Sequence, residues 1–268
     1  MRAIIGATLA ATALAVSASA AQADTPAPGY AQFAGCPSPK TENPAISSCV
    51  HGTVKGGHIR FGKKEVPISV PIGLSGGVDE VFGNFSVSAK GGLEAVKQPV
   101  PGGLIGSTKL DWLADSLNLT QLKLYAVAEP AGIPTLGVAD IRLPIKVHLI
   151  NSVLGNNCYV GSFANPIVLD MTTGTTSPPP PNKPITGKFP TVGVSPLEVL
   201  LLSGGTFVDN SFAVPRASGC VLSLFRGALK INIDNLLNSI SGLPAPAGTN
   251  AASFDIDTEL VDARLVYP

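Results

Sequence analysis

Charged residues are scarce in this chain. Lys, Arg, Asp and Glu make up 13% of its 268 residues, which is about half of their usual share. The 18 basic and 18 acidic residues balance. They form no basic stripe that could neutralise a phosphate backbone, so we expect no nucleic-acid partner. With so little charge, the surface must be covered mainly by Ser, Thr, Asn, Gly and Pro.

Long apolar runs are missing beyond the N-terminal segment, and so are the familiar ligand motifs. No later stretch reaches the roughly 20 apolar residues that a membrane-spanning helix needs, so we expect a protein that is not transmembrane. His51, His58 and His148 form no ligand cluster, and no two cysteines have the close spacing of a zinc site. No Walker loop or dinucleotide fingerprint is present. The sequence therefore predicts no metal and no cofactor.

The N-terminus has the layout of a secretory signal peptide. Arg2 precedes an Ala-rich apolar segment, Ala3 to Ala20, and small residues stand one and three positions before Asp24. This order predicts cleavage before Asp24, with cleavage after Ala20 as the alternative. We therefore expect residues 1–23 to be a signal peptide. The mature chain is expected to be secreted, either free outside the cell or associated with the envelope.

Four cysteines in an exported chain predict two disulfides. The sequence allows three pairings, and we favour the local ones, Cys36 with Cys49 and Cys158 with Cys220. Closing the longer loop is expected to add about 4 kcal/mol of stability. The segment from Phe33 to Cys36 is similar to a lipobox, but lipidation requires the cysteine directly after the apolar core. We therefore assign Cys36 to a disulfide.

The 29 glycines and 24 prolines predict many turns and few long helices. Several segments alternate between apolar and polar residues, and Ile141–Leu149 is the clearest predicted strand. His58–Phe61 and Val66–Ile72 predict a β-hairpin. The expected fold is an all-β, antiparallel, sandwich-like domain with two or three short helices. We expect this single domain to cover residues 57–268, after a Pro/Ser-rich arm over residues 24–56 with the local disulfide.

The sequence predicts short helices at Leu110–Leu117, Ser195–Leu202 and Asp234–Ser241. The second begins with a capping box and a proline at its first position, and Gly242 is placed to end the third. The second helix is so apolar that we expect it to pack on the sheet and to hold an apolar ligand there. In the last strand the apolar residues occupy even positions up to Leu260 and odd positions from Val261 onward. This change predicts a β-bulge near Leu260–Val261.

Two patterns raise the question of catalysis or metal binding. Gly73–Gly77 matches G-x-S-x-G with Ser75 as nucleophile, but that motif requires a strand-to-helix turn that the flanking residues do not indicate. Asp255, Asp257 and Glu259 alternate, so they share one face of the last strand. They could bind Ca²⁺, although a solvated polar face explains them more simply. For paired acids in glycoside hydrolysis, the sequence does not establish the required separation of the two carboxyls. We assign no catalytic and no metal-binding residue.

The central part of the chain contains several distinctive strings: Gly155–Ser162, Asn165–Ile167, Thr172–Pro181, Val208–Pro215 and Gly219–Cys220. With them, the chain from Gly57 onward resembles a family of uncharacterised secreted proteins of actinobacteria. The resemblance implies an exported envelope or extracellular protein, and it supplies no catalytic residues.

The sequence therefore favours a secreted, non-catalytic protein of the cell envelope or its surroundings, with a binding or structural role. Its expected partner is an apolar or envelope-derived ligand, and the sequence does not specify the ligand-binding residues. The alternative is a secreted hydrolase that depends on Ser75 or on paired carboxylates. A third hypothesis is a coat protein that associates with itself.

Overall fold

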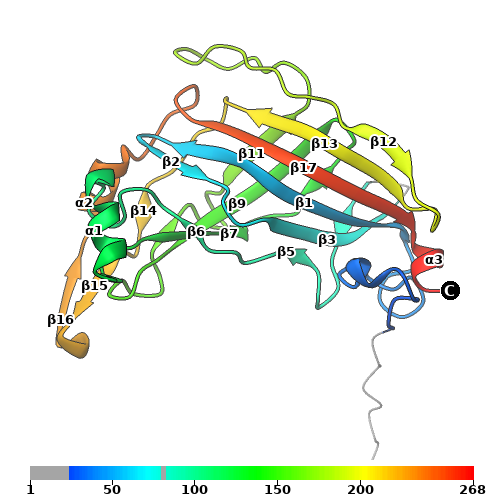
Figure 1. Ribbon diagram of the computed structural model, residues 1–268, viewed down its shortest axis with the longest axis horizontal. Coiled ribbons are helices and arrows are strands. Elements are labelled where there is room, and N and C mark those ends of the chain that lie inside the picture. The colour runs from blue at the N-terminus through cyan, green and yellow to red at the C-terminus, as the bar shows by residue number, and fades with distance from the viewer. Residues whose placement is uncertain (1–23, 80–82) are drawn as a thin grey trace, which may run out of the picture.

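The computed structural model describes residues 24–79 and 83–268 of the chain. The predicted signal peptide, residues 1–23, lies outside this part. Most of the regular structure is antiparallel β (Figure 1). The prediction of an all-β, sandwich-like domain is therefore confirmed.

Within the described residues, fifteen strands form one large sheet and two more form a separate hairpin. The strands of the large sheet are β1 (Ile46–Phe61), β2 (Lys64–Pro67), β3 (Ile72–Asp79), β4 (Phe85–Ser86), β5 (Gly92–Leu93), β6 (Gln98–Pro99), β7 (Tyr125–Pro130), β8 (Thr135–Leu136), β9 (Asp140–Ile150), β10 (Tyr159–Val160), β11 (Ile167–Thr172), β12 (Thr191–Val194), β13 (Leu200–Asp209), β14 (Ala217–Ser218) and β17 (Ala251–Asp262). The separate hairpin consists of β15 (Val221–Leu224) and β16 (Leu229–Asn232).

Helical segments are few and short in the described chain. The α-helices are α1 (Asp111–Ser116), α2 (Asp234–Ser241) and α3 (Ala263–Val266), and the 3₁₀ turns are η1 (Ala31–Phe33), η2 (Thr108–Leu110) and η3 (Phe225–Gly227). The predicted helix Asp234–Ser241 is confirmed, and Gly242 ends it with a φ of 68°, in the left-handed region that glycine adopts without strain.

The large sheet curls so that its two sides face each other. Its main path runs β14-β10-β9-β11-β13-β17-β1-β3-β4, and β7 and β6 extend it from the second edge of β9. At the far side an isolated bridge joins Asn84, next to β4, to Thr135 of β8. The two layers of the sandwich-like domain are therefore parts of one curled sheet, and they enclose the interior between them.

β-Bulges keep apolar side chains on the inner face of the two strands that flank β17. β1 carries one extra residue opposite β17 between Val54 and Gly56, and β13 carries one between Leu202 and Gly205. A bulge shifts the side-chain parity by one. Val54 before the bulge of β1 and Ile59 after it consequently both face the interior.

The predicted bulge at Leu260–Val261 is wrong, because β17 itself is regular and the extra residues belong to its neighbours. The parity change has another cause. Phe254, Ile256 and Leu260 face the interior, whereas Val261 and Ala263 belong to a second apolar cluster. Successive residues of a strand point to opposite faces, so one strand serves two cores.

The predicted helix Ser195–Leu202 is wrong, because β12 and β13 form a hairpin there. Ser195 does begin a turn, since its Oγ accepts hydrogen bonds from the N–H groups of Leu197 and Val199. Glu198 then adopts a left-handed conformation (φ 59°), which ends helical geometry. The apolar residues that follow join β13, which is hydrogen-bonded to both β12 and β17.

The domain boundary expected between residues 56 and 57 falls inside β1, so the chain from Ile46 onward belongs to the sheet. The many Ser, Thr and Gly residues of this stretch conceal a strand whose two edges pair with β3 and β17. Before it, residues 24–45 pack on the outside of the sheet. There they form an outer cluster with the C-terminus: Tyr30, Phe33, Cys36, Ile46, Cys49, Val199, Val261, Ala263, Val266 and Tyr267.

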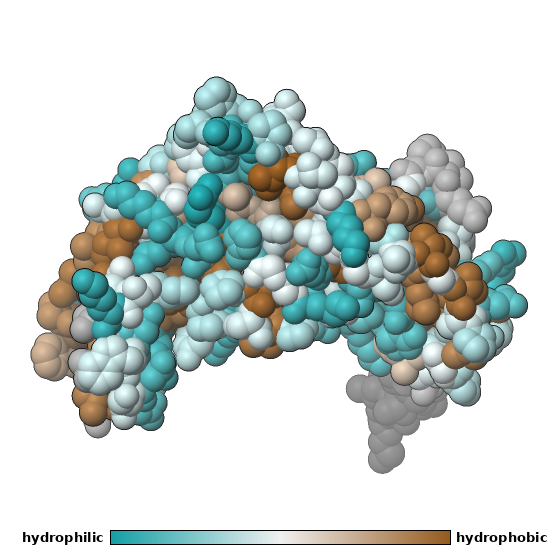
Figure 2. Space-filling view, turned by 45° about the horizontal axis from the view of Figure 1, so that its top comes forward, coloured by the Kyte–Doolittle hydropathy of each residue, from teal (hydrophilic) through white to brown (hydrophobic). Residues whose placement is uncertain are grey.

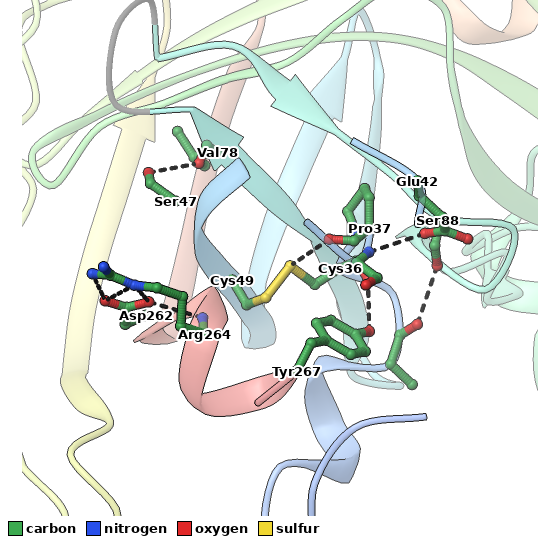
Figure 3. The surroundings of a disulfide bond; sticks show 12 residues. Cys36, Pro37, Glu42, Ser47, Cys49, Val78, Ser88, Asp262, Arg264 and Tyr267 are labelled. Atoms are coloured by element: carbon green, nitrogen blue, oxygen red, sulfur yellow. Dashed lines mark hydrogen bonds and ion pairs between the residues drawn. A yellow bond between two sulfur atoms is a disulfide. The ribbon is translucent and has the colours of Figure 1, made fainter. Parts of the chain in front are cut away.

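Both favoured disulfides, Cys36–Cys49 and Cys158–Cys220, are present. The first lies in the outer cluster, where Tyr267 Oη donates a hydrogen bond of 2.8 Å to the carbonyl of Cys36 (Figure 3). Burial raises the pKa of the Tyr267 phenol, with a smaller contribution from Glu42 and Asp24. This contact ties the C-terminus to the N-terminal segment.

Candidate ligand-binding cavity

The curled sheet encloses a cavity of about 360 Å³. Residues from eleven strands (β1, β2, β3, β5, β6, β7, β8, β9, β11, β13 and β17) line it, and nearly all of them are apolar. Representative lining residues are Val50, Leu74, Ile145, Met171, Phe207 and Ile256. The expected apolar space between a sheet and the helix at 195–202 is thus corrected to a space inside the sheet. Leu202 does line this space, but from β13.

Small residues at inward-facing positions help to keep the interior hollow. Gly52, Ala126 and Ala128 line the cavity from β1 and β7. A Cβ placed on Gly52 would meet its nearest neighbours only at 3.8–3.9 Å, which is ordinary van der Waals contact. Packed interiors rarely contain voids much larger than a water molecule, and an empty apolar cavity of this size costs on the order of several kcal/mol. This cost favours a cavity that is filled by a ligand.

The alternation Val50-His51-Gly52-Thr53-Val54 was the sequence signal that could have identified this wall. It places Val50, Gly52 and Val54 on one face of the strand. On that face an unoccupied position, Gly52, therefore lies between two valine side chains. We did not predict these lining residues, because strand parity gives the face of a side chain but not the distance to the opposite wall.

The few polar lining residues concentrate toward one end of the cavity. Ser48 lies near the start of β1, Asp79 at the end of β3, and Thr258 two residues before Leu260 on β17. Val138 also lines the cavity, and 48% of its surface is exposed, so the cavity opens to solvent here. We call this the polar end. A ligand with one polar group would place that group beside Ser48 and Thr258 while its apolar part lies in the interior.

The opposite end of the interior is closed by packed side chains. Leu124, Leu154, Leu237 and Leu243 are buried in the same core as the cavity walls. Phe212 packs there edge-to-face with the ring of Phe61, with 6.1 Å between ring centroids. The Cys158–Cys220 disulfide belongs to this core as well. It therefore stabilises the closed end, whereas Cys36–Cys49 lies at the end with the opening.

Buried amides also hold the closed end together. Asn238 of α2 donates to the carbonyls of Ala217 and Asp234 and accepts from the N–H of Ala217. Fully buried Asn250 donates to the carbonyl of Phe212 and accepts from the N–H of Gly62. Because unsatisfied buried amides are costly, these bonds fix the positions of α2 and of the turn after β1.

Comparisons of the chain with protein-family models, curated proteins and solved structures find no match. The assignment of a site therefore rests on the geometry of this chain. None of the helices in residues 24–79 and 83–268 has the length and apolar character required to traverse a bilayer.

Ser75 does not lie on a nucleophile elbow. It is in the middle of antiparallel β3, opposite His51 of β1, which in turn lies opposite Glu259 of β17. Gly35 passes so close above Ser75 that a Cβ on Gly35 would collide with the Ser75 Oγ. Among the described residues, the buried Nδ1 of His51 has no hydrogen-bond partner. Ser75, His51 and Glu259 therefore lack the serine–histidine–carboxylate hydrogen bonds of a serine hydrolase.

The three alternating acids of β17 each have a different partner on the outer face. Asp255 accepts a hydrogen bond from Thr206, and Glu259 accepts one from Gln32. Partial burial opposes ionisation of Asp257, but hydrogen bonds from the Gly204 N–H and from Lys55, together with the Lys55 charge, lower its pKa. In the part of the chain that is described, no group of three or more His, Cys, Asp or Glu residues could hold a metal ion.

His148 lies on the outer face of β9, in a small network rather than in isolation. Its ring stacks on Tyr159, with 4.4 Å between centroids, and its Nδ1 is 3.2 Å from Glu129. Lys146 pairs with the same carboxylate at 2.9 Å, and its ammonium lies over the Tyr159 and Phe163 rings. These contacts join β7, β9 and β10 on the side of the sheet that faces away from the cavity.

Proposed function

We propose that this chain is an exported, non-catalytic protein that holds an apolar small molecule inside its curled sheet. The observation that carries the proposal is the cavity of about 360 Å³ with its almost wholly apolar lining. Ligand sites of proteins are typically cavities of about 300–1,000 Å³ with apolar walls and a few polar groups that orient the ligand. This cavity has those properties.

The shape and polarity of the cavity define the class of ligand. An apolar cavity of roughly 150 Å³ takes up one benzene molecule, so this one has room for two to three groups of that size. An acyl chain or a small polycyclic compound fits this description. Ser48, Thr258 and Asp79 at the polar end favour a single polar head group. Ser48 and Thr258 are uncharged, so a hydroxyl, ester or amide head group matches them.

Export is supported by the N-terminal sequence and by the two disulfides. Disulfides persist in oxidising compartments outside the cytosol. A protein outside the cell that binds an apolar compound can keep it dissolved or carry it between the envelope and the medium.

Binding of a neutral apolar fluorophore, N-phenyl-1-naphthylamine, tests the cavity. The wild-type protein should bind one molecule with saturable fluorescence enhancement. Gly52→Leu places four carbons in the cavity and should weaken binding by about tenfold or more. Gly193→Leu makes the same change on β12, where a new Cβ meets nothing within 4 Å, and should leave binding unchanged. Equal binding by both variants, or no saturable binding by the wild-type protein, would disprove the proposal.

Native mass spectrometry of the protein purified from its own culture medium would identify the natural ligand. We expect a co-purifying mass that disappears after extraction with organic solvent. The same preparation of Gly52→Leu should be largely free of that mass, whereas Gly193→Leu should retain it. A mass retained equally by both variants would place the ligand outside the cavity.

A further inference from the structure

Exposed apolar side chains gather at the closed end of the molecule, far from the polar end of the cavity. Phe225 is 80% exposed at the tip of the β15–β16 hairpin, Trp112 of α1 is 67% exposed, and Leu236 of α2 is 56% exposed. Leu229 and Ile231 on β16 are exposed as well. Figure 1 places α1, α2 and the hairpin together, and Figure 2 shows hydrophobic surface at that end.

Hydrogen bonds hold these elements to one another. The N–H of Ser223 in β15 donates to the carbonyl of Val153. Just before it in the chain, Asn151 donates through its side chain to the carbonyl of Lys123, which follows α1. The loop before α1 lies against α2, since a Cβ on Gly106 would collide with Ile240. The exposed side chains therefore belong to one surface, which we call the apolar end.

The outer edge of the hairpin has no strand beside it in the described chain. β15 bonds to residues 153–155 on one side, whereas all four residues of β16 are exposed and β16 pairs only with β15. Clustered exposed aromatic and aliphatic side chains on such an element mark an interaction surface rather than ordinary surface exposure.

The charges at this end identify the partner. Between Val221 and Asn232 the sequence contains two basic residues, Arg226 and Lys230, and no acidic one. Lys109 and Lys230 are exposed.

Three acids lie nearby, and each of them bonds within the protein. Asp111 accepts a hydrogen bond from the Gly102 N–H, Asp115 pairs with Lys123 at 2.9 Å, and Asp234 accepts from the Cys220 N–H. Apolar groups flanked by the exposed Lys109 and Lys230 complement an anionic lipid surface, and Trp is a side chain that prefers the interface of a bilayer.

We propose that the apolar end docks on an anionic lipid surface. Phe225 and the apolar side chains of β16 enter the head-group region, and Trp112 lies at the interface. Lys109 and Lys230 contact lipid phosphates. The cavity then opens on the side of the molecule that faces away from the lipid. This proposal does not depend on the occupancy of the cavity, and it can hold or fail on its own.

Vesicle flotation and tryptophan fluorescence test the proposal with the full mature protein. The vesicles contain phosphatidylcholine with about one-third phosphatidylglycerol, and pure phosphatidylcholine serves as the comparison. Trp112 is the only tryptophan, so its emission reports directly on the apolar end. We expect the protein to float with the anionic vesicles and its emission to shift to shorter wavelength. High salt should weaken binding.

Two matched variants locate the surface. Phe225→Ser with Ile231→Ser should weaken binding to anionic vesicles by about tenfold or more. Val192→Ser with Val194→Ser removes two side chains of β12 that are comparably exposed, at 62% and 69%, outside the apolar end, and should leave binding unchanged. Lys230→Glu should weaken binding to the anionic vesicles only. These residues are exposed, so the variants should fold, which circular dichroism checks.

Three outcomes would overturn the proposal. The wild-type protein fails to bind the anionic vesicles, or the β12 variant loses as much binding as the hairpin variant. The third outcome is a concentration-dependent dimer in sedimentation that Phe225→Ser with Ile231→Ser abolishes, because the partner of this end would then be a second copy of the chain.

Discussion

Two apolar cores share the strands β1 and β17, yet one is filled and the other is hollow. The outer cluster contains Phe33 and Val266, neither of which has exposed surface, together with the Cys36–Cys49 disulfide. The interior on the other face contains a cavity of about 360 Å³. Cys49 and Val50 are neighbours in sequence and belong to opposite cores. The sheet is thus packed from outside by the outer cluster, while its interior remains hollow.

The largest expected effect comes from opening the filled core. Phe33→Ala removes a fully buried ring from the outer cluster and should lower the free energy of unfolding by about 3–5 kcal/mol. Urea unfolding followed by Trp112 fluorescence or circular dichroism measures this. A loss below about 1 kcal/mol would show that the outer cluster does not clamp the sheet.

A matched pair of smaller substitutions compares the two faces directly. Val261 faces the outer cluster and Val50 faces the cavity, and they are 4% and 3% exposed. Val261→Ala leaves a new void among packed atoms, whereas Val50→Ala enlarges a space in which the side chain already lacks some contacts. We expect losses of about 2–3 kcal/mol and about 1–2 kcal/mol, respectively, for the ligand-free protein. Equal losses in urea unfolding would indicate a filled interior.

The pH dependence of stability should reside mainly on the outer face, because the cavity has few ionisable groups. The pKa of Asp262 is lowered by its hydrogen bonds with Arg264, and that of Asp257 is lowered by Gly204 and Lys55 despite partial burial. For acids with lowered pKa values, the stabilisation is present above the ordinary Asp pKa of about 3.9. It is lost as the pH falls below that value and through the lowered pKa values.

The double variant Asp257→Asn with Asp262→Asn should therefore be less stable than the wild-type protein at pH 7, by less than about 1 kcal/mol per carboxyl, because both sites are partly solvated. The difference should shrink toward acid pH, as measured by urea unfolding across the range. A difference that persists unchanged below the acid transition would assign the effect to lost hydrogen-bond geometry instead of charge.

Local chemistry in the sequence predicted local structure well. Gly242 identified the end of α2, and alternation identified β9 and the β1–β2 hairpin. The spacing of the cysteines favoured the correct pairs. The helix end, the alternating strand, the hairpin and the Cys36–Cys49 pair depend on neighbouring residues or short loops. Cys158–Cys220 spans 62 residues and follows from Cys36 and Cys49 being the nearer pair.

Features that depend on distant strands were not predictable in the same way. Ser195 and Glu198 have the chemistry of a helix start, but pairing of Leu200–Leu202 with β17 decides the outcome. The change of apolar positions at Val261 was interpreted as a bulge because the sequence of this strand does not indicate a second core on its outer face. That core, the outer cluster, is formed by residues 24–45 and the C-terminus. The cavity arises from the separation of opposite walls, which no local pattern contains.

The position of β17 has a consequence for how the chain acquires its structure. This strand lies between β1 and β13 and is the last strand of the chain, so the sheet stays divided until residues 251–262 are available. Pairing His51 with Glu259 closes a loop of about two hundred residues, and such non-local pairing makes folding slow. The hydrogen bonding of the sheet is therefore completed late, when residues 251–262 fill the space between β1 and β13.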